Sequence, residues 1–175
     1  MAPMIAPQTG KTDDLSNDST RIAGAGGAAS GLFDGRIHIL SLRVYYEDTD
    51  AAGIVYYANY LKFAERARTE LMRLLGSEHR PMMENEGVGF AVRSCTADYL
   101  QPARLDDAIE VRTEVAEVGG ASLSMTQTVL RPHSGAAAPE TLVRMHVRLA
   151  CIDGRQRAAR MPRAVRAALR DMVAE

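Results

Sequence analysis

The chain has little net charge, few cysteines and no long hydrophobic run, and each of these absences excludes a class of protein. A formal net charge of −1 over 175 residues argues against electrostatic binding to nucleic acid or to an anionic membrane surface. No apolar run approaches the roughly 18–20 residues that a membrane-spanning helix needs. An apolar fraction of 46% and a charged fraction of 25% are typical of one ordinary globular domain.

The two cysteines, Cys95 and Cys151, have no CxxC spacing and lie in strand-like runs. We expect both to be buried free thiols, as is usual in a reducing cytosol. The N-terminus is apolar only over its first residues, and Lys11 and Asp13 come too early for the apolar core of about 7–15 residues in a signal peptide. We therefore expect a cytoplasmic protein that is neither secreted nor anchored in a membrane.

The first 34 residues are rich in Gly, Ala, Ser, Thr and Asp and show no sustained apolar periodicity. Such a composition buries too little surface to offset the entropy of ordering it. We expect a disordered tail over residues 1–34 and one folded domain over residues 35–175, with a helix at its C-terminal end. The tail contains a formal match to the dinucleotide-binding fingerprint at residues 24–29, but no strand precedes it, so the context that the motif needs is missing.

Periodicity predicts the elements of the domain. Residues 37–46 have the composition of a strand. A helix is predicted from about residue 58 to 75, with Asn59 as a plausible cap and Gly76 as a plausible stop. Its apolar residues recur at helical spacing and form one stripe whose middle is alanine, which would let the helix lie close to a sheet.

Beyond a loop that follows this helix, the apolar period changes to two, which is typical of strands. Four further strands are predicted, over residues 88–99, 109–115, 123–129 and 143–151. Short hairpin connections make these strands antiparallel. The predicted fold is therefore α+β, with a five-stranded antiparallel sheet wrapped around a long central helix. One helix cannot cover such a sheet fully, so we expect a homodimer or homotetramer.

Residues 45–60 set three carboxylates directly against a run of tyrosines and the start of the helix. A carboxylate in a partly apolar cleft is costly unless hydrogen bonds or positive potential compensate it. The first N–H groups of a helix have no internal partners and can stabilise a carboxylate or an oxyanion formed beside it. This pairing suits attack on an activated carbonyl, with the acid as nucleophile or as base for water. Equally open is that Asp48 or Asp50 merely caps a turn.

Other chemistries have less support. Asp48 and Asp50, followed by Gly53, resemble the start of a calcium-binding loop, but Ala52 and Asn59 stand where oxygen ligands are required. A magnesium site on the two aspartates stays open, although nothing phosphate-binding accompanies it. A Ser-His-Asp triad is disfavoured because no histidine lies near this segment. No metal and no cofactor is predicted.

Residues 44–56 and 63–70, with echoes at 97–107 and 119–123, resemble the hot dog-fold acyl-CoA thioesterases of the 4-hydroxybenzoyl-CoA thioesterase type. Within that group they resemble the thioesterases associated with the Tol-Pal system. The similarity covers about residues 36–165. It implies a sheet wrapped around a central helix, in agreement with the order of elements above. It also implies cleavage of acyl-CoA, or of an acyl carrier protein thioester, to a free acid and a thiol.

The resemblance also implies roles for residues. The family's catalytic aspartate corresponds to Asp50, and its oxyanion donor to the backbone N–H of Tyr57, where related members carry His. The substrate-binding residues that it implies are Gly53, Val55, Tyr56, Asn59 and Tyr60. The aromatic residues beside them fit an acyl pocket and ordinary core packing equally well; they are Tyr45, Tyr46, Tyr56 and Phe63.

Three alternatives accompany this prediction. Another hot dog subgroup uses a carboxylate on the helix, which makes Glu65 a reserve candidate, although a salt-bridge or interface role is favoured. A dehydratase of the same fold would need a catalytic histidine near the helix, and none lies between His38 and His79. The last alternative is a non-catalytic acyl-carrier or envelope-complex binding partner, which the carboxylate of Asp50 disfavours because a pure binder needs none.

Overall fold

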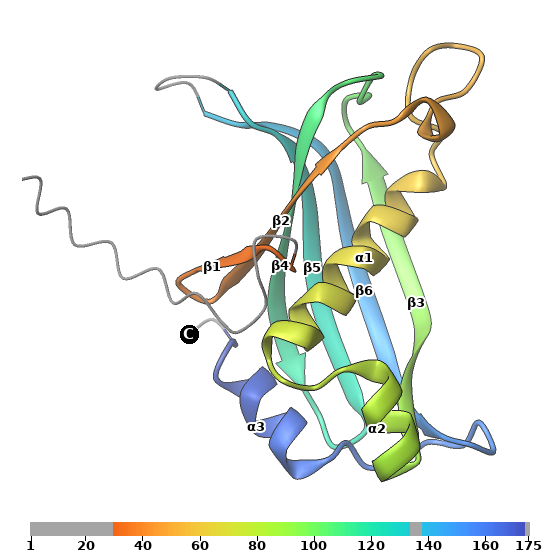
Figure 1. The fold of residues 1–175 in the computed structure, drawn as a ribbon, viewed down its shortest axis with the longest axis vertical. Coiled ribbons are helices and arrows are strands. Elements are labelled where there is room, and N and C mark those ends of the chain that lie inside the picture. The colour runs from red at the N-terminus through yellow and green to blue at the C-terminus, as the bar shows by residue number, and fades with distance from the viewer. Residues whose placement is uncertain (1–29, 134–137, 174–175) are drawn as a thin grey trace, which may run out of the picture.

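The computed structural model describes residues 30–133 and 138–173. Six strands form one antiparallel sheet in the order β1-β2-β4-β5-β6-β3, and helix α1 lies across one of its faces (Figure 1). The elements in chain order are β1 (Leu32–Asp34), β2 (Ile37–Arg43), the short 3-10 helix η2 (Tyr46–Asp48), α1 (Asn59–Leu74), α2 (His79–Glu86), β3 (Val88–Tyr99), β4 (Ala108–Val118), β5 (Ser122–Arg131), β6 (Glu140–Asp153) and α3 (Arg163–Arg170). The predicted α+β arrangement around a central helix is confirmed.

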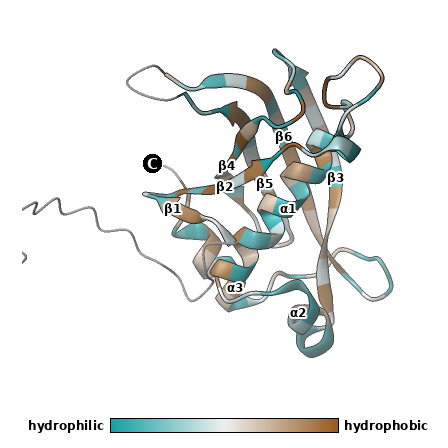
Figure 2. Ribbon diagram, turned by 45° about the horizontal axis from the view of Figure 1, so that its top comes forward, coloured by the Kyte–Doolittle hydropathy of each residue, from teal (hydrophilic) through white to brown (hydrophobic). Residues whose placement is uncertain are grey.

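The core lies between α1 and the inner face of the sheet. The apolar stripe of α1 is buried, with Ala64 and Ala67 at its centre, where their small side chains allow a close approach of the helix to the strands. The strands alternate buried and more exposed residues, as along β4, because successive side chains point to opposite faces. Hydrophobic and hydrophilic residues accordingly alternate along the strands in Figure 2.

One polar side chain ties the helix to the sheet. Gln127 on β5 is fully buried and donates through Nε2 to the carbonyl of Ala64, at 2.9 Å, and to Oγ1 of Thr113, at 3.0 Å. Its Oε1 accepts a hydrogen bond from Nη1 of Arg68 at 2.7 Å. Because a buried polar group without partners costs free energy, these bonds favour one position of α1 over the sheet.

The sheet has six strands instead of the expected five. The extra strand, β1, pairs with β2 at one edge and lies within the predicted tail, so the boundary at residue 34 was placed too late. At Gly31, φ is +84° and an added Cβ would stand 2.3 Å from the carbonyl oxygen of Ile39, so this entry to the strand needs glycine. The rest of the tail, with its fingerprint match, lies outside the described residues.

Helix α2 was not predicted from the sequence, which read this segment as a loop. Pro81 stands in the first turn of the helix, where the missing N–H of proline leaves no intrahelical bond unmade. Gly87, with φ of 66°, ends the helix in the left-handed conformation. The proline that indicated a loop therefore falls at a position that a helix tolerates.

Two smaller expectations were also wrong. Cys151 is buried, but Cys95 is exposed because β3 forms the outer edge of the sheet. The residue before α1 is Ala58, and no side chain caps the helix, so Asn59 is its first residue and not its cap.

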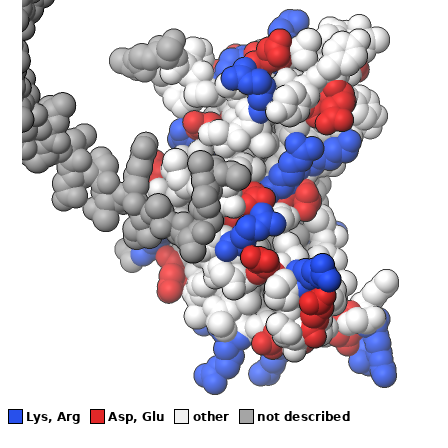
Figure 3. All heavy atoms as spheres, viewed as in Figure 1, with Lys and Arg blue, Asp and Glu red and all other residues white. Residues whose placement is uncertain are grey.

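Within the described part of the chain, no helix combines the length and the apolarity needed to cross a membrane. Basic and acidic side chains are interspersed over the face drawn in Figure 3.

Candidate active site

Residues 49–55 fold as a narrow loop with a tight turn at its tip. The N–H of Gly53 donates to the carbonyl of Asp50 at 2.9 Å, and the N–H of Asp50 donates to the carbonyl of Ile54 at 2.9 Å. Gly53 has φ of 71°, a conformation that glycine adopts at little cost. Thr49 and Val55 close the loop through a β-bridge. Asp50 therefore occupies the first position of the turn.

The carboxylate of Asp50 is held at one oxygen only. Its Oδ1 accepts a hydrogen bond from the N–H of Ala52 at 2.8 Å. Within the residues that the structure describes, Oδ2 has no hydrogen-bond partner, and the side chain is exposed. One oxygen thus orients the group while the other stays available for chemistry.

Asp48 has a different environment. It is 4% exposed, and its Oδ2 accepts a hydrogen bond from the N–H of Tyr45 at 2.8 Å. Its carbonyl accepts from Nδ2 of Asn59 at 2.9 Å and from the N–H of Tyr56 at 2.9 Å. Asp48 therefore anchors the loop to the start of α1.

Among the described residues, no group of three or more His, Cys, Asp or Glu side chains is placed to hold a metal ion.

The N–H of Tyr57 lies at the start of α1, two residues before its first residue. It has no hydrogen-bond partner among the described residues. It precedes the N-terminal N–H groups of the helix, which carry partial positive charge and attract anions. This N–H is therefore available to an oxyanion.

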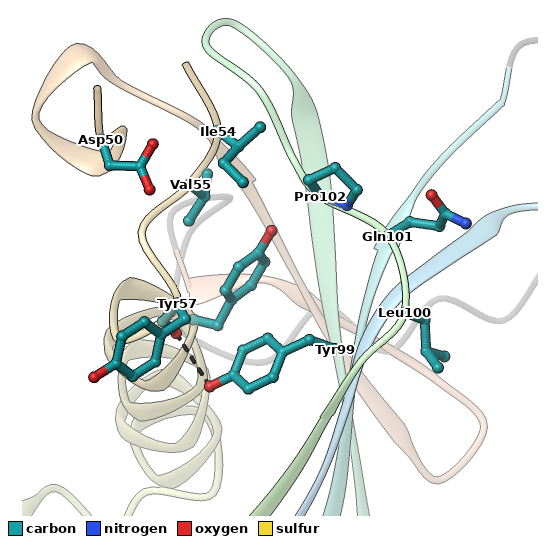
Figure 4. Close-up of a pocket in the computed structure, with 9 residues that line it drawn as sticks. Asp50, Ile54, Val55, Tyr57, Tyr99, Leu100, Gln101 and Pro102 are labelled. Carbon is teal, nitrogen blue, oxygen red and sulfur yellow. Dashed lines mark hydrogen bonds between the residues drawn. The ribbon is translucent and has the colours of Figure 1, made fainter. Parts of the chain in front are cut away.

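Asp50 and Tyr57 border one pocket of about 380 Å³, which we call the tyrosine pocket. Its lining residues are Asp50, Ile54, Val55, Tyr57, Tyr60, Tyr99, Leu100, Gln101 and Pro102. In Figure 4, Asp50 and Tyr57 lie on one side of the pocket, and Leu100, Gln101 and Pro102 on the other. The hydroxyl of Tyr99 donates to the carbonyl of Tyr57 at 3.3 Å, which links the end of β3 to the residues before α1.

Tyr60 joins the two walls of this pocket. It is buried, and its hydroxyl oxygen accepts a hydrogen bond from the N–H of Ala103 at 2.8 Å. Its ring packs edge-on against Tyr99, with centroids 5.9 Å apart. Burial raises the pKa of Tyr60 above its usual value of 10.0, so the phenol is neutral at physiological pH.

The structure brings together only part of the residues implied by the family resemblance. Val55 and Tyr60 line the tyrosine pocket with Asp50 and Tyr57, whereas Gly53 lines a neighbouring hollow. Asn59 and Tyr56 do not line it: Asn59 is buried against the Asp48 carbonyl, and the exposed Tyr56 packs on Tyr57 at 4.6 Å between centroids. Asn59 therefore contacts the residue before the loop, and Tyr56 contacts a lining residue without lining the pocket itself.

The aromatic cluster does not form one acyl pocket, because Phe63 is in the core while Tyr45 and Tyr46 are exposed. Glu65 lies in a separate cavity of about 120 Å³ with Arg68 and His79. Sequence reasoning missed the wall from Tyr99 to Pro102. The sequence indicated this wall only through the family resemblance at residues 97–107, because residues 99–102 carry no charged side chain that would have marked them as a candidate site.

Comparison with known proteins identifies the family. The family model described as the thioesterase-like superfamily matches residues 44–169. The chain belongs to this superfamily. This chain is therefore a thioesterase, which is the class of enzyme that the sequence resemblance predicted.

Individual relatives agree with this assignment. The acyl-CoA thioesterase YbgC of Haemophilus influenzae is 42% identical over 130 residues, which cover 73% of this chain and 90% of that protein. A probable thioesterase from Bartonella henselae is 32% identical in sequence with a TM-score of 0.67, over 72% of this chain and 99% of the other. A 4-hydroxybenzoyl-CoA thioesterase variant solved with 4-hydroxybenzoyl-CoA is 23% identical, with a TM-score of 0.71 over 77% and 99% of the two chains. At that identity the last match supports the hot dog fold alone.

Proposed function

We propose that this thioesterase hydrolyses acyl-CoA to a free acid and coenzyme A, with Asp50 as the acting carboxylate and the Tyr57 N–H as oxyanion donor. The observation that carries the proposal is the arrangement of Asp50. One carboxylate oxygen is held by Ala52 at 2.8 Å and the other has no partner among the described residues, and Asp50 lines the same pocket as Tyr57, whose N–H is also without a partner there. An acyl carrier protein thioester is the alternative substrate.

The reaction then follows from these two groups. The thioester carbonyl oxygen lies toward the Tyr57 N–H, which stabilises the negative charge that develops as the carbon becomes tetrahedral. Asp50 either attacks the carbon, forming an anhydride that water cleaves after the thiolate leaves, or removes a proton from the attacking water. In both routes the products are a carboxylate and a thiol.

The two free cysteines agree with a cytoplasmic enzyme, because the cytoplasm keeps thiols reduced.

Replacement of Asp50 by asparagine tests the proposal. Asp50→Asn keeps the shape of the side chain but removes the nucleophile or base, so kcat for acyl-CoA should fall by about 10²–10⁴-fold. The matched control is Asp34→Asn on the exposed edge strand β1, which should keep full activity. Asp50→Asn enzyme that retains most of its activity would exclude both routes. Single-turnover hydrolysis in isotopically labelled water would label Asp50 itself only in the nucleophilic route.

We further propose that two copies of the chain pair through β3. This strand lies at the edge of the sheet, is long, and exposes Val92 at 52%. An unpaired edge of this kind is a template for pairing with another chain, and an antiparallel pair of identical strands fits the twofold symmetry of most homodimers. Such a pair would place the second copy beside the tyrosine pocket, because Tyr99 at the end of β3 lines it. A homotetramer would add a second contact.

A further inference from the structure

Tyr99 is the last residue of β3, and its backbone is held by the neighbouring strand. It pairs with Val143 of β6, whose side chain is buried in the core. The N–H groups of the next two residues, Leu100 and Gln101, both donate to the carbonyl of Leu142, at 2.8 and 3.1 Å. Side chains of directly opposite residues lie on the same face of a sheet. Tyr99 therefore projects toward α1 from a fixed base.

The segment within reach of Tyr99 is the turn that leads into α1. In this turn the N–H of Asn59 donates to the carbonyl of Tyr56 at 2.8 Å, so Tyr57 and Ala58 occupy the two central positions. The carbonyl of Tyr56 and the N–H of Tyr57 belong to one planar peptide unit. The direction of this N–H, the proposed oxyanion donor, therefore depends on how the whole turn is held.

Tyr99 holds the central peptide of this turn. The carbonyl of Tyr57 accepts a hydrogen bond from the Tyr99 hydroxyl at 3.3 Å (Figure 4) and, among the described residues, accepts no other. The ring of Tyr99 also packs edge-on against Tyr57, with centroids 6.3 Å apart, and against Tyr60, with centroids 5.9 Å apart. Partial burial raises the pKa of Tyr99 above its usual value of 10.0, so the phenol keeps its proton at neutral pH and can donate.

Stabilisation of an oxyanion depends steeply on geometry, because the donor must lie about 2.7–3.1 Å from the developing charge and small displacements weaken the bond. We propose that Tyr99 is a positioning residue for the reaction: its hydroxyl ties the turn before α1 to the end of β3 and so holds the Tyr57 N–H where the transition state needs it. This rests on the proposed function and adds a residue of the sheet to its two acting groups. Tyr99 acts through the Tyr57 backbone and not on the reacting atoms.

Replacement of Tyr99 by phenylalanine tests this role, because it removes the hydroxyl and keeps the ring. For acyl-CoA, kcat should fall about three- to tenfold, which corresponds to the loss of one neutral hydrogen bond. KM should change less than about twofold, since an oxyanion donor acts mainly in the transition state. The matched control is Tyr45→Phe, which removes a phenol hydroxyl from a ring that is 61% exposed and does not line the tyrosine pocket. It should match wild type.

A second measurement asks whether the loss falls on the oxyanion. In the dithioester analogue of the same acyl-CoA, sulfur replaces the carbonyl oxygen, and sulfur is the weaker hydrogen-bond acceptor. A misplaced N–H therefore slows the thioester more than the dithioester. The ratio of the two kcat values should be lower in Tyr99→Phe than in wild type, by about the same factor as kcat itself. In Tyr45→Phe the ratio should stay at the wild-type value.

Three results for folded Tyr99→Phe would overturn the proposal while leaving the proposed function intact. The first is a wild-type kcat. The second is a higher KM with an unchanged kcat, because the hydroxyl would then bind the substrate directly. The third is a lower kcat with an unchanged ratio, because the hydroxyl would then act on a step other than oxyanion binding. Failure of the folded wild-type protein to hydrolyse acyl-CoA would instead overturn the proposed function itself.

Discussion

At the scale of single residues, two aspartates that are two positions apart have different surroundings because only one of them reaches the surface. Asp48 is buried and bonded to the N–H of Tyr45, whereas Asp50 is exposed and bonded at one oxygen to the N–H of Ala52. A carboxylate that is buried and does not line the tyrosine pocket is not placed to act on a substrate bound there. Residue type and hydrogen bonds to the carboxylate therefore do not separate the two; burial and position at the tyrosine pocket do.

His38 is the other residue with an unusual environment. It is fully buried on β2, and Nε2 lies 2.9 Å from the carbonyl oxygen of Ser30. Among the described residues Nδ1 has no hydrogen-bond partner. Burial lowers the pKa of His38 below its usual value of 6.5, because the charged imidazolium would lose its hydration.

A pH dependence of stability follows. Since the pKa of His38 is lower in the folded state than the 6.5 of the unfolded state, the unfolded chain binds more protons near and below that pH. The stabilisation is present above pH 6.5 and is lost as the pH falls toward the lowered folded-state pKa. Urea unfolding at steps from about pH 8 to about pH 5 should show a steeper loss of unfolding free energy for wild type than for His38→Gln. The exposed His146, replaced by Gln, is the control; equal slopes in all three proteins would contradict the prediction.

At the scale of elements, hydrogen bonds between segments that are distant in the chain hold the site together. Tyr60 of α1 accepts a bond from the N–H of Ala103, and the carbonyl of Ala103 accepts one from the N–H of Val55 at 2.9 Å. The loop after β3, the helix α1 and the loop that carries Asp50 therefore meet at one buried residue. Gln127 on β5 fixes the same helix to the sheet, two strands away from the edge strand β3.

Removal of the Gln127 amide tests how much this link stabilises the helix. Gln127→Leu leaves the hydroxyl of Thr113 and the partly buried guanidinium of Arg68 without their partner. The free energy of unfolding should fall by roughly 2–4 kcal/mol, since unsatisfied buried polar and charged groups are costly. Thr128→Val, on the opposite face of the same strand, should change it by less than about 0.5 kcal/mol. Denaturant titration measures both; a Gln127→Leu protein as stable as wild type would show that the link contributes nothing.

At the scale of the whole molecule, the two edges of the sheet differ. The edge at β1 is a strand of 3 residues, whereas the edge at β3 has 12 residues. Short edge strands discourage pairing, and long ones favour it. The asymmetry predicts association through β3 and not through β1.

Single charged substitutions at the two edges check this. Val92→Arg places a charge on the paired edge and should give a monomer with lower thioesterase activity, because the tyrosine pocket would lose the neighbouring copy. Leu32→Arg on β1 should stay a dimer with wild-type activity. Sedimentation velocity gives the oligomeric state. The prediction is wrong if the wild-type protein is a monomer or if Val92→Arg remains a dimer.

The sequence by itself determined the elements with strong periodicity. The limits of β3 at residues 88 and 99 were predicted as observed, and α1 was predicted to within about a residue at each end. The family resemblance also singled out Asp50 and Tyr57, which the structure places at one pocket. Periodicity succeeds here because repeated burial on one face is written into neighbouring residues.

Only the tertiary structure decided the rest. The three residues of β1 are too few to show a period, and they form a strand because β2 supplies their partners. The exposure of Cys95 follows from the position of β3 at the edge of the sheet, which no local pattern contains. The wall of the tyrosine pocket from Tyr99 to Pro102 meets Asp50 across some fifty residues of chain. The spacing of residues along the chain does not predict such long-range contacts, because they arise from packing between segments that are distant in the sequence.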